Sequence, residues 1–295
     1  METFMQCIFS GTAQGAIYGL IALGCSVIFS TIRMGHFAQG DFFMFGAFFA
    51  YQALSLWNQQ VWVGVVLAVM GTTALMLLTE RFVYRPMYGR TGMTLLMTTL
   101  GMQYIIQGIA RIVWGKEARK VLPFFPMGTV TISLFGLNVN LSIENIMLIL
   151  ISAALMVVLT LFMKFTKAGL AMSAVSMNRD AARLMGVKLT TVFATTFIMA
   201  AALAAIAGML MSPRFSVSFS MGSMVGMKAM TAAVLGGFGN MPGAMLGGVL
   251  LGIVETVCAF YLSTAYRDVF TFLVLIIVLF LYPQGILGVR KITKV

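Results

Sequence analysis

Residues 178–186 read Asn178-Arg179-Asp180-Ala181-Ala182-Arg183-Leu184-Met185-Gly186, a short charged segment between two long apolar stretches of the chain. The segment belongs to a basic loop, Lys164 to Lys188, which the charge-free stretches 145–163 and 189–213 flank. Each stretch has about the 20 residues that a helix needs to cross a bilayer. Asn178 or Asp180 can cap a helix start, and Gly186 fits a left-handed C-terminal cap. The pattern predicts two membrane-spanning helices joined by a loop that holds a short helix.

The composition predicts membrane-spanning helices along the whole chain. Of 295 residues, 60% are hydrophobic and only 9% are charged, which exceeds the apolar fraction of an ordinary soluble domain. Further charge-free stretches cover residues 3–32, 42–79, 91–110, 229–254 and 269–289. The stretch 42–79 can hold two helices, broken at Trp57-Asn58-Gln59-Gln60. We expect an all-α integral membrane protein, a polytopic bundle of about 8–9 spans that forms a single domain over residues 1–295.

The beginning of the chain predicts a retained helix. The first apolar stretch has no basic segment before it and no clear small-residue cleavage site, so it does not read as a removed signal peptide.

The net charge of +11 is explained by membrane orientation rather than by nucleic-acid binding. Lys and Arg concentrate in three places, and loops of this kind face the cytoplasm. The residues are Arg81, Arg85 and Arg90; Lys164, Lys167, Arg179, Arg183 and Lys188; and Arg290, Lys291 and Lys294. A cytoplasmic C-terminus then requires an odd number of crossings between residues 211 and 289.

Two segments interrupt the helical pattern. Residues 236–243, Gly-Gly-Phe-Gly-Asn-Met-Pro-Gly, are unsuited to a helix interior. They predict either a broken helix, with a short piece at 223–236 and a span at 243–262, or an ordinary cytoplasmic turn between two spans. Residues 129–134 and 137–141 alternate polar and apolar around Phe135-Gly136, which predicts a small extracytoplasmic β-hairpin.

Polar and glycine residues inside the spans are candidates for a translocation path or gate, because ionisable groups at membrane depth usually face a cavity or a partner. The candidates are His36, Gln39, Asp41, Gly236, Gly237, Asn240 and Glu255. Simpler roles stay open for three of them. Asp41 can cap a helix, Glu255 can pair with a neighbouring helix, and His36, the only histidine, can be structural. A metal site built on several imidazoles is excluded.

The chain has no motif for catalysis or nucleotide binding. It lacks His-Glu-x-x-His, Gly-x-Ser-x-Gly and a phosphate-binding loop, so we expect no enzymatic activity and no cofactor bound by this chain. The helix at 178–186 is then either an amphipathic turn on the membrane surface or a segment that docks on another subunit. In the second case Ala181, Ala182, Leu184 and Met185 supply apolar contacts, while Arg179 and Arg183 are free to pair.

Six segments spread over nearly the whole length carry a family resemblance. They are residues 15–24 (GAIYGLIALG), 37–47 (FAQGDFFMFGA), 80–86 (ERFVYRP), 181–187 (AARLMGV), 226–244 (GMKAMTAAVLGGFGNMPGA) and 282–288 (YPQGILG). With them the chain resembles the LivH-type permease subunits of the branched-chain amino-acid ABC importers.

The resemblance implies a subunit of a prokaryotic inner membrane that pairs with a second, homologous permease and two cytoplasmic ATPases. It receives solute from an extracytoplasmic binding protein, ATP and Mg are bound by the ATPases, and residues 178–186 form the coupling helix. The family usually has Asn-Phe-Ala-His-Gly-Asp or Glu where this chain has His36-Phe37-Ala38-Gln39-Gly40-Asp41. We expect a hydrophobic branched-chain amino acid as solute, with urea or a short amide as the alternative. Two hypotheses from other functional classes stay open, a secondary transporter and a membrane scaffold that transports no solute.

Overall fold

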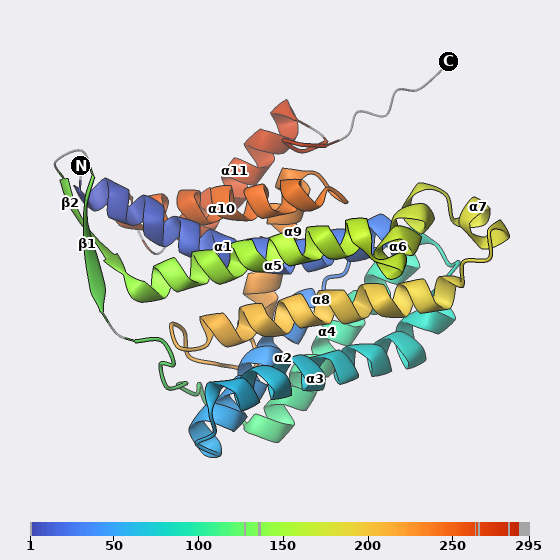
Figure 1. Ribbon diagram of the computed structural model, residues 1–295, viewed down its shortest axis with the longest axis horizontal. Coiled ribbons are helices and arrows are strands. Elements are labelled where there is room, and N and C mark those ends of the chain that lie inside the picture. The colour runs from blue at the N-terminus through green and yellow to red at the C-terminus, as the bar shows by residue number, and fades with distance from the viewer. Residues whose placement is uncertain are drawn as a thin grey trace.

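The computed structural model describes residues 2–126, 128–134, 137–262, 264, 266–282 and 284–288 of the chain. It is a bundle of helices with one two-stranded sheet, and the long helices run between two opposite ends (Figure 1). We call these the hairpin end, where β1 and β2 lie, and the α7 end, where α6 and α7 lie. In chain order the elements are α1 (Glu2–Ile32), α2 (Gln39–Tyr51), η1 (Gln52–Leu56), α3 (Val61–Thr79), η2 (Glu80–Tyr84), η3 (Arg85–Met87), α4 (Gly92–Trp114), β1 (Thr129–Leu134), β2 (Leu137–Ser142), α5 (Ile143–Phe165), α6 (Lys167–Met177), α7 (Arg179–Leu184), α8 (Leu189–Met211), α9 (Met221–Gly236), α10 (Met241–Tyr261) and α11 (Arg267–Leu281).

The fold is that of a polytopic helical membrane protein. Within the described residues, five helices are long and apolar enough to cross a bilayer: Thr3–Ile32, Val61–Met87, Ile143–Phe165, Leu189–Met211 and Met241–Tyr261. Helices α2, α9 and α11 are shorter, and the 23-residue α4 is more polar. The expected count of about 8–9 spans therefore depends on these four further helices.

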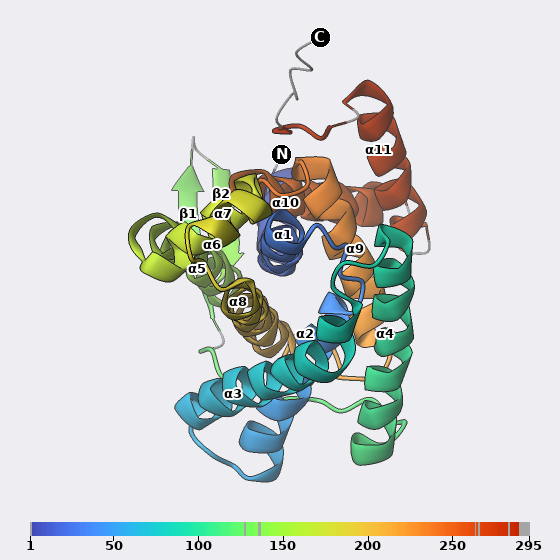
Figure 2. The same ribbon diagram turned by 90° about the vertical axis from the view of Figure 1, so that its right-hand side faces the viewer.

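Helix α1 occupies the centre of the bundle, in contact with α5, α8, α9 and α10 (Figure 2). Its closest neighbour is α10, and Gly11, Gly15 and Gly19 of α1 line the crossing. A Cβ atom added to Gly15 would lie 2.5 Å from the carbonyl oxygen of Gly248 and 2.6 Å from the Cα of Val249. In lipid, where packing drives helix association, this contact between backbones holds the two helices together.

Each predicted interruption of a helix is present. Residues 57–60 separate η1 from α3, and residues 237–240 separate α9 from α10. The second break lies at the α7 end, because the Gly239 N–H donates to Ser26 Oγ (3.1 Å) near the end of α1 and Gly239 shares a cavity with Arg33 and Ser176. The break therefore lies at an end of the bundle and joins two consecutive helices, as in the second of the two expected arrangements; whether α9 is itself a span is a separate prediction.

A further interruption, between α1 and α2, is the one that places polar groups inside the bundle. The chain leaves α1 at Ile32, and α2 begins at Gln39 with its first residues fully buried. The Gln39 side chain donates to the Ala200 carbonyl oxygen (2.8 Å) and lies against Gly24 of α1. Gly24 precedes the end of α1 by eight residues, about 12 Å of helix. Helix α2 therefore starts within the bundle rather than at its surface.

The expected hairpin is also present. Strands β1 and β2 pair antiparallel, from Thr129 opposite Ser142 to Leu134 opposite Leu137. The turn residues Phe135 and Gly136 lie outside the described residues, as do Pro283 of the last family segment and Arg290, Lys291 and Lys294 of the expected cytoplasmic tail.

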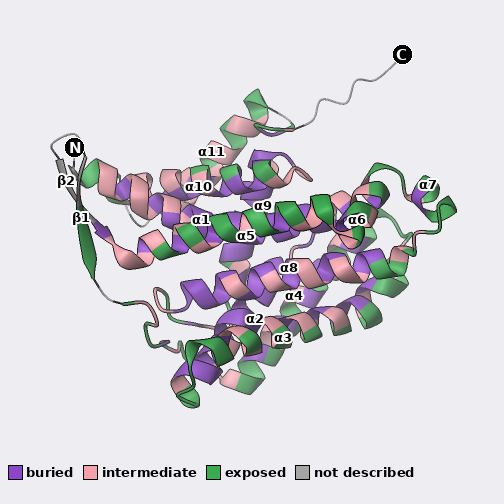
Figure 3. Cartoon of the chain, in the orientation of Figure 1, coloured by how far each residue is buried: buried purple, intermediate pink, exposed green. Residues whose placement is uncertain are grey.

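The outer surface between the two ends is apolar. Exposed residues follow α3 and α5 along their length, whereas α8 is largely buried (Figure 3). On α5 the exposed residues include Leu150, Val157 and Val158, and on α11 they include Ile276 and Phe280. Large apolar side chains on the outside of a bundle indicate a surface that faces lipid.

Candidate functional site

Helix α7 is a short helix with both ends capped. The Asn178 Oδ1 atom accepts hydrogen bonds from the N–H groups of Asp180 (3.0 Å) and Ala181 (3.1 Å), so Asn178 rather than Asp180 is the N-cap. Gly186 has φ +84°, a left-handed conformation that glycine adopts without strain. The Gly186 N–H donates to the Arg183 carbonyl, and the Val187 N–H donates to the Ala182 carbonyl, which completes a Schellman cap.

The surface of α7 differs in part from the expectation. Only Ala182 is buried against the chain, whereas Leu184 and Met185 are 89% and 85% exposed. Arg183 is exposed as predicted, but Arg179 is not free to pair. Its Nη2 donates to the Thr31 carbonyl oxygen (3.1 Å), and its guanidinium lies over the Phe193 ring.

This anchoring holds α7 in place. Burial and then the charge of Arg33 lower the pKa of Arg179, yet a guanidinium stays protonated in proteins. The contact therefore ties α7 to the end of α1 by a charged group and leaves its apolar residues outward.

His36 and Gln39 form a buried polar centre at the start of α2. The His36 ring is 1% exposed, with Nδ1 3.1 Å from Gln39 Oε1 and Nε2 3.0 Å from the Tyr84 hydroxyl. Because Gln39 Nε2 already donates to the Ala200 carbonyl, its Oε1 must accept. The neutral ring then donates from Nδ1 and accepts the Tyr84 proton at Nε2. Both ring nitrogens are occupied, so His36 joins α2, η2 and α8.

Asp41 lies close to that centre but has other partners. It is the third residue of α2 rather than its cap, and its side chain is fully buried. Its Oδ1 accepts a hydrogen bond from Gln107 Nε2 (2.8 Å) of α4, and Oδ2 has no partner. Gln107 and Gln103 both donate to Ser223 Oγ of α9, at 2.6 and 2.8 Å. Three helices thus meet at one polar cluster.

Glu255 belongs to a separate cluster of charges. Lys228 Nζ of α9 lies 2.8 Å from Glu255 Oε1 and 2.7 Å from Asp268 Oδ1, while Arg267 Nε lies 3.0 Å from Glu255 Oε1. Lys228 also lies near the Tyr18 ring of α1. Two cations and two carboxylates balance each other, so the cluster fastens α11 to α9 and α10. Glu255 has the helix-pairing role that the sequence left open.

The remaining predicted residues, Gly236, Gly237 and Asn240, lie together at the α7 end. Gly236 packs against the backbone of Gly243. Asn240 accepts from the Gly243 N–H (3.3 Å) and donates to the Leu287 carbonyl oxygen (2.7 Å). These contacts cap α10 and fix the turn from α9. The structure does not bring these three residues into contact with the Asp41 cluster.

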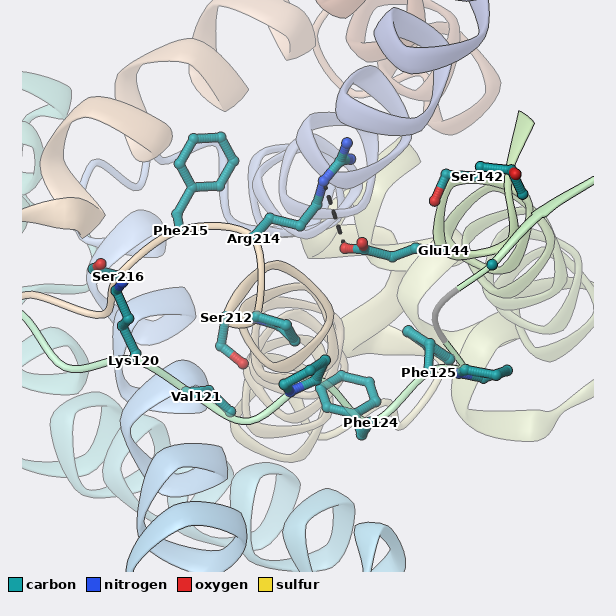
Figure 4. A pocket seen from close by; sticks show the side chains of 15 residues that line it. Lys120, Val121, Phe124, Phe125, Ser142, Glu144, Ser212, Arg214, Phe215 and Ser216 are labelled. Carbon is teal, nitrogen blue, oxygen red and sulfur yellow. Dashed lines mark ion pairs between the residues drawn. The ribbon is translucent and has the colours of Figure 1, made fainter. Parts of the chain in front are cut away.

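The hairpin end holds a cavity of about 850 Å³. Its walls come from the segment before β1, the start of α5 and the loop after α8 (Figure 4). Arg214 points toward Glu144, with Nε 3.5 Å from Oε1, and Lys120 lines the same cavity. The cavity is open and mixes charged with aromatic side chains, among them Phe124 and Phe125.

Several polar residues of these clusters are missing from the sequence-based candidates: Tyr84, Gln103, Gln107, Ser223 and Lys228. Gln103 and Gln107 stand four residues apart in an apolar stretch, so they share a helix face. Lys228 interrupts the apolar segment 221–236. Either signal could have singled out these residues, but their partners lie far away in the sequence.

These features define a helical integral membrane protein whose exposed, capped helix at one end is suited to contact a further subunit. Comparison with known proteins specifies the class. Residues 7–279 match the family described as branched-chain amino acid transport system, permease component. The chain belongs to this family. It is a permease component of an ABC transporter, not a catalytic subunit.

Relatives share this match over nearly their full lengths. The chain is 33% identical to the high-affinity branched-chain amino acid transport system permease protein LivH of Escherichia coli K12 and 32% identical to the corresponding protein BraD of Pseudomonas aeruginosa. In both cases the match covers 99% of this chain and 98% of the relative. Among solved structures, PsaBC from Streptococcus pneumoniae in complex with Fab has a similar fold. Its TM-score is 0.50 at 12% identity, with 95% of this chain and 92% of that chain covered.

Proposed function

We propose that this permease is half of the transmembrane part of a binding-protein-dependent importer for branched-chain amino acids in a prokaryotic inner membrane. It pairs with a second, homologous permease, and two cytoplasmic ATPases that bind ATP and Mg drive it. The similarity to LivH and BraD, which are permease proteins of high-affinity branched-chain amino acid transport systems, supports the solute. The exposed helix α7 is the observation that carries the proposal.

Helix α7 has the properties of a coupling helix. Leu184 and Met185 are exposed at the end of the bundle, next to Met177, which is 86% exposed. Apolar side chains in this position gain stability when a partner covers them. The caps and the Arg179 anchor make α7 a rigid body that transmits movement of an ATPase to α1 and α8.

The orientation follows from the distribution of charge. The α7 end carries the basic residues of the loops 81–90 and 164–188, so it faces the cytoplasm. We infer that α1 to α5 and α8 to α11 each cross the bilayer, five of them as helices that are long and apolar enough to do so on their own. The N-terminus then lies outside and the C-terminus in the cytoplasm, and the hairpin is extracytoplasmic.

The hairpin end receives the binding protein. Glu144 compensates Arg214 in the cavity of Figure 4, whereas Lys116, Arg119 and Lys120 of the adjoining segment outnumber Glu117. This excess of positive charge is complementary to a binding protein with acidic docking lobes.

Substitutions in α7 test the coupling role. We expect Arg183→Glu, and Gly186→Val at its left-handed position, to reduce solute uptake at least about tenfold, because the first reverses an exposed charge and the second strains the cap. Uptake and ATPase retention are measured on the purified complex. Leu170→Ser on the exposed side of α6 is the control, with uptake unchanged. Normal import by both α7 variants, with the ATPase still bound, would exclude the coupling role.

Co-purification tests the importer itself. The tagged chain should bring down two ATPase subunits and a second permease, and the binding protein loaded with leucine, isoleucine or valine should stimulate ATP hydrolysis and uptake. Stimulation by urea or a short amide instead would assign the alternative solute. Recovery of the chain alone, with uptake in vesicles free of ATP, would replace the importer by a secondary transporter.

A further inference from the structure

The face formed by α4 and α9 carries polar groups at the middle of the bundle. Gln103 is the midpoint of α4, with about 16 Å of helix on either side. Gln103, Gln107 and Ser223 are half-buried, and within the described residues the Oε1 atoms of both glutamines have no hydrogen-bond partner. Ser223 Oγ accepts two hydrogen bonds, so its own proton remains available to donate.

Two other outer faces, as far as the structure describes them, expose apolar residues at this depth. The exposed residues of α11 are aliphatic or aromatic, among them Leu273 and Ile277, and those at mid-depth on α5 include Val157 and Val158. An amide or hydroxyl that faces hydrocarbon without a partner costs about 1 to 3 kcal/mol or more. The α4–α9 face therefore borders a polar environment rather than lipid.

Asp41 makes this environment favourable for a positively charged group. Its carboxylate lies behind Gln107, fully buried, and no Lys or Arg among the described residues lies within ion-pair distance of it. Two helix starts converge on it. Asp41 is in the first turn of α2, and a Cβ on Gly222 of the first turn of α9 would lie 2.7 Å from its Oδ1. The positive ends of both helices favour the ionised form of this carboxyl group, and its Oδ2 remains without a partner.

The face is also ordered along its length. Arg111 follows Gln107 by four residues on α4 and lies over the Phe219 ring toward the hairpin end. In the opposite direction, Met227 and Met230 follow Ser223 by four and seven residues on the same side of α9, and Met230 approaches Gly35 near the α7 end. From the hairpin end toward the α7 end, the face therefore carries a cation, then the polar groups, then two methionine side chains.

We propose that the α4–α9 face is the wall that this chain contributes to the solute path. In this proposal the amides of Gln103 and Gln107 and the hydroxyl of Ser223, with Asp41 behind them, bind the ammonium group of a zwitterionic amino acid. The glutamine Oε1 atoms accept from the ammonium, and the Asp41 charge attracts it. The aliphatic side chain of the solute contacts Met227 and Met230. This inference rests on the proposed function, which supplies the amino acid and the second permease that closes the opposite wall.

The test is cysteine labelling in the assembled complex with Cys7, Cys25 and Cys258 replaced by alanine. Ser223→Cys and Gln103→Cys are treated from the hairpin side with a trimethylammonium and with a sulfonate methanethiosulfonate, and the rates are normalised to those of a free thiol. We expect the cationic reagent to react at least about tenfold faster, because the Asp41 charge acts at short range in a low dielectric. Asp41→Asn should remove this preference without loss of assembly.

Ile105→Cys is the matched control, since Ile105 is exposed and, two residues from Gln103, lies on a different face of α4, which we expect to contact lipid. It should react with neither reagent. Loss of reactivity at Ser223→Cys and Gln103→Cys, as at the control, would place the face against lipid or a closed contact and overturn the proposal. Equal rates for both reagents, unchanged by Asp41→Asn, would overturn the ammonium site.

The labelling separates the two proposals, because it needs no solute. Cation-selective labelling in a complex that fails to import branched-chain amino acids would contradict the proposed solute and leave the path wall in place. Import of branched-chain amino acids without labelling would overturn the path wall and leave the proposed solute in place.

Discussion

Two ion pairs of this chain lie in contrasting surroundings. Lys228 and Glu255 are each 2% exposed, whereas Arg214 and Glu144 at the hairpin end are 23% and 32% exposed. Removal of one partner from a buried pair leaves a charge in a medium that cannot solvate it. When one partner of a pair near the surface is removed, water solvates the charge that remains. The same type of contact therefore has different consequences at the two sites.

We expect Lys228→Met to lower the free energy of unfolding by about 3 kcal/mol or more, because Glu255 and Asp268 then share only Arg267. Glu144→Gln should cost at most about 1 kcal/mol. Reversible unfolding of the purified chain in detergent measures both values. Equal losses in the two variants would show that burial does not set the contribution of the Lys228 pair.

The contact between α1 and α10 decides stability at the scale of elements. Gly11 meets Ile253 and Gly15 meets Gly248 and Val249, all through backbone atoms. Backbone cannot move aside as a flexible side chain can, so an added methyl group must separate the helices. Gly101 of α4 has no atom within 4 Å of an added Cβ, although it also lies within a long helix.

Gly15→Ala should therefore destabilise the bundle by about 1 to 3 kcal/mol through overpacking. Gly101→Ala should be neutral or stabilise by up to about 1 kcal/mol, because alanine favours the helix. Thermal unfolding of both variants in the same detergent gives the comparison. A Gly15→Ala variant as stable as the parent would mean that α1 and α10 can separate without loss of packing.

At the scale of the whole molecule, the two ends of the bundle differ in their surface features. The α7 end has a basic loop with an exposed apolar helix, and the hairpin end has an open cavity beside a two-stranded sheet. This polarity matches an importer that meets its binding protein on one side of the membrane and its ATPases on the other.

We expect a cysteine at Thr129 to react with an impermeant maleimide in right-side-out vesicles only, and a cysteine at Asp180 in inverted vesicles only. This expectation follows from the proposed orientation, in which the positive charge of the α7 end keeps that end in the cytoplasm. Labelling in a background without the native cysteines checks both positions. The opposite pattern would invert the orientation and, with it, the assignment of α7 to the ATPases.

Much of the architecture is readable in local patterns of the chain. Helix α1 spans Glu2–Ile32 against an expected 3–32, the breaks at 57–60 and 236–243 are present, and the hairpin has the predicted strands. The caps of α7 follow from Asn178 and Gly186. These features depend on residues a few positions apart, whose hydropathy, turn chemistry and spacing the sequence displays directly.

The composition of the polar clusters was decided only by tertiary structure. Asp41 meets Gln107 across 66 residues, His36 meets Tyr84 across 48, and Arg179 reaches Thr31 across 148. Such pairs depend on how each helix is rotated and where it crosses its neighbours. Close glycine contacts and the start of α2 within the bundle set those angles. The chain alone therefore determines that polar groups enter the membrane, and packing determines which of them face one another.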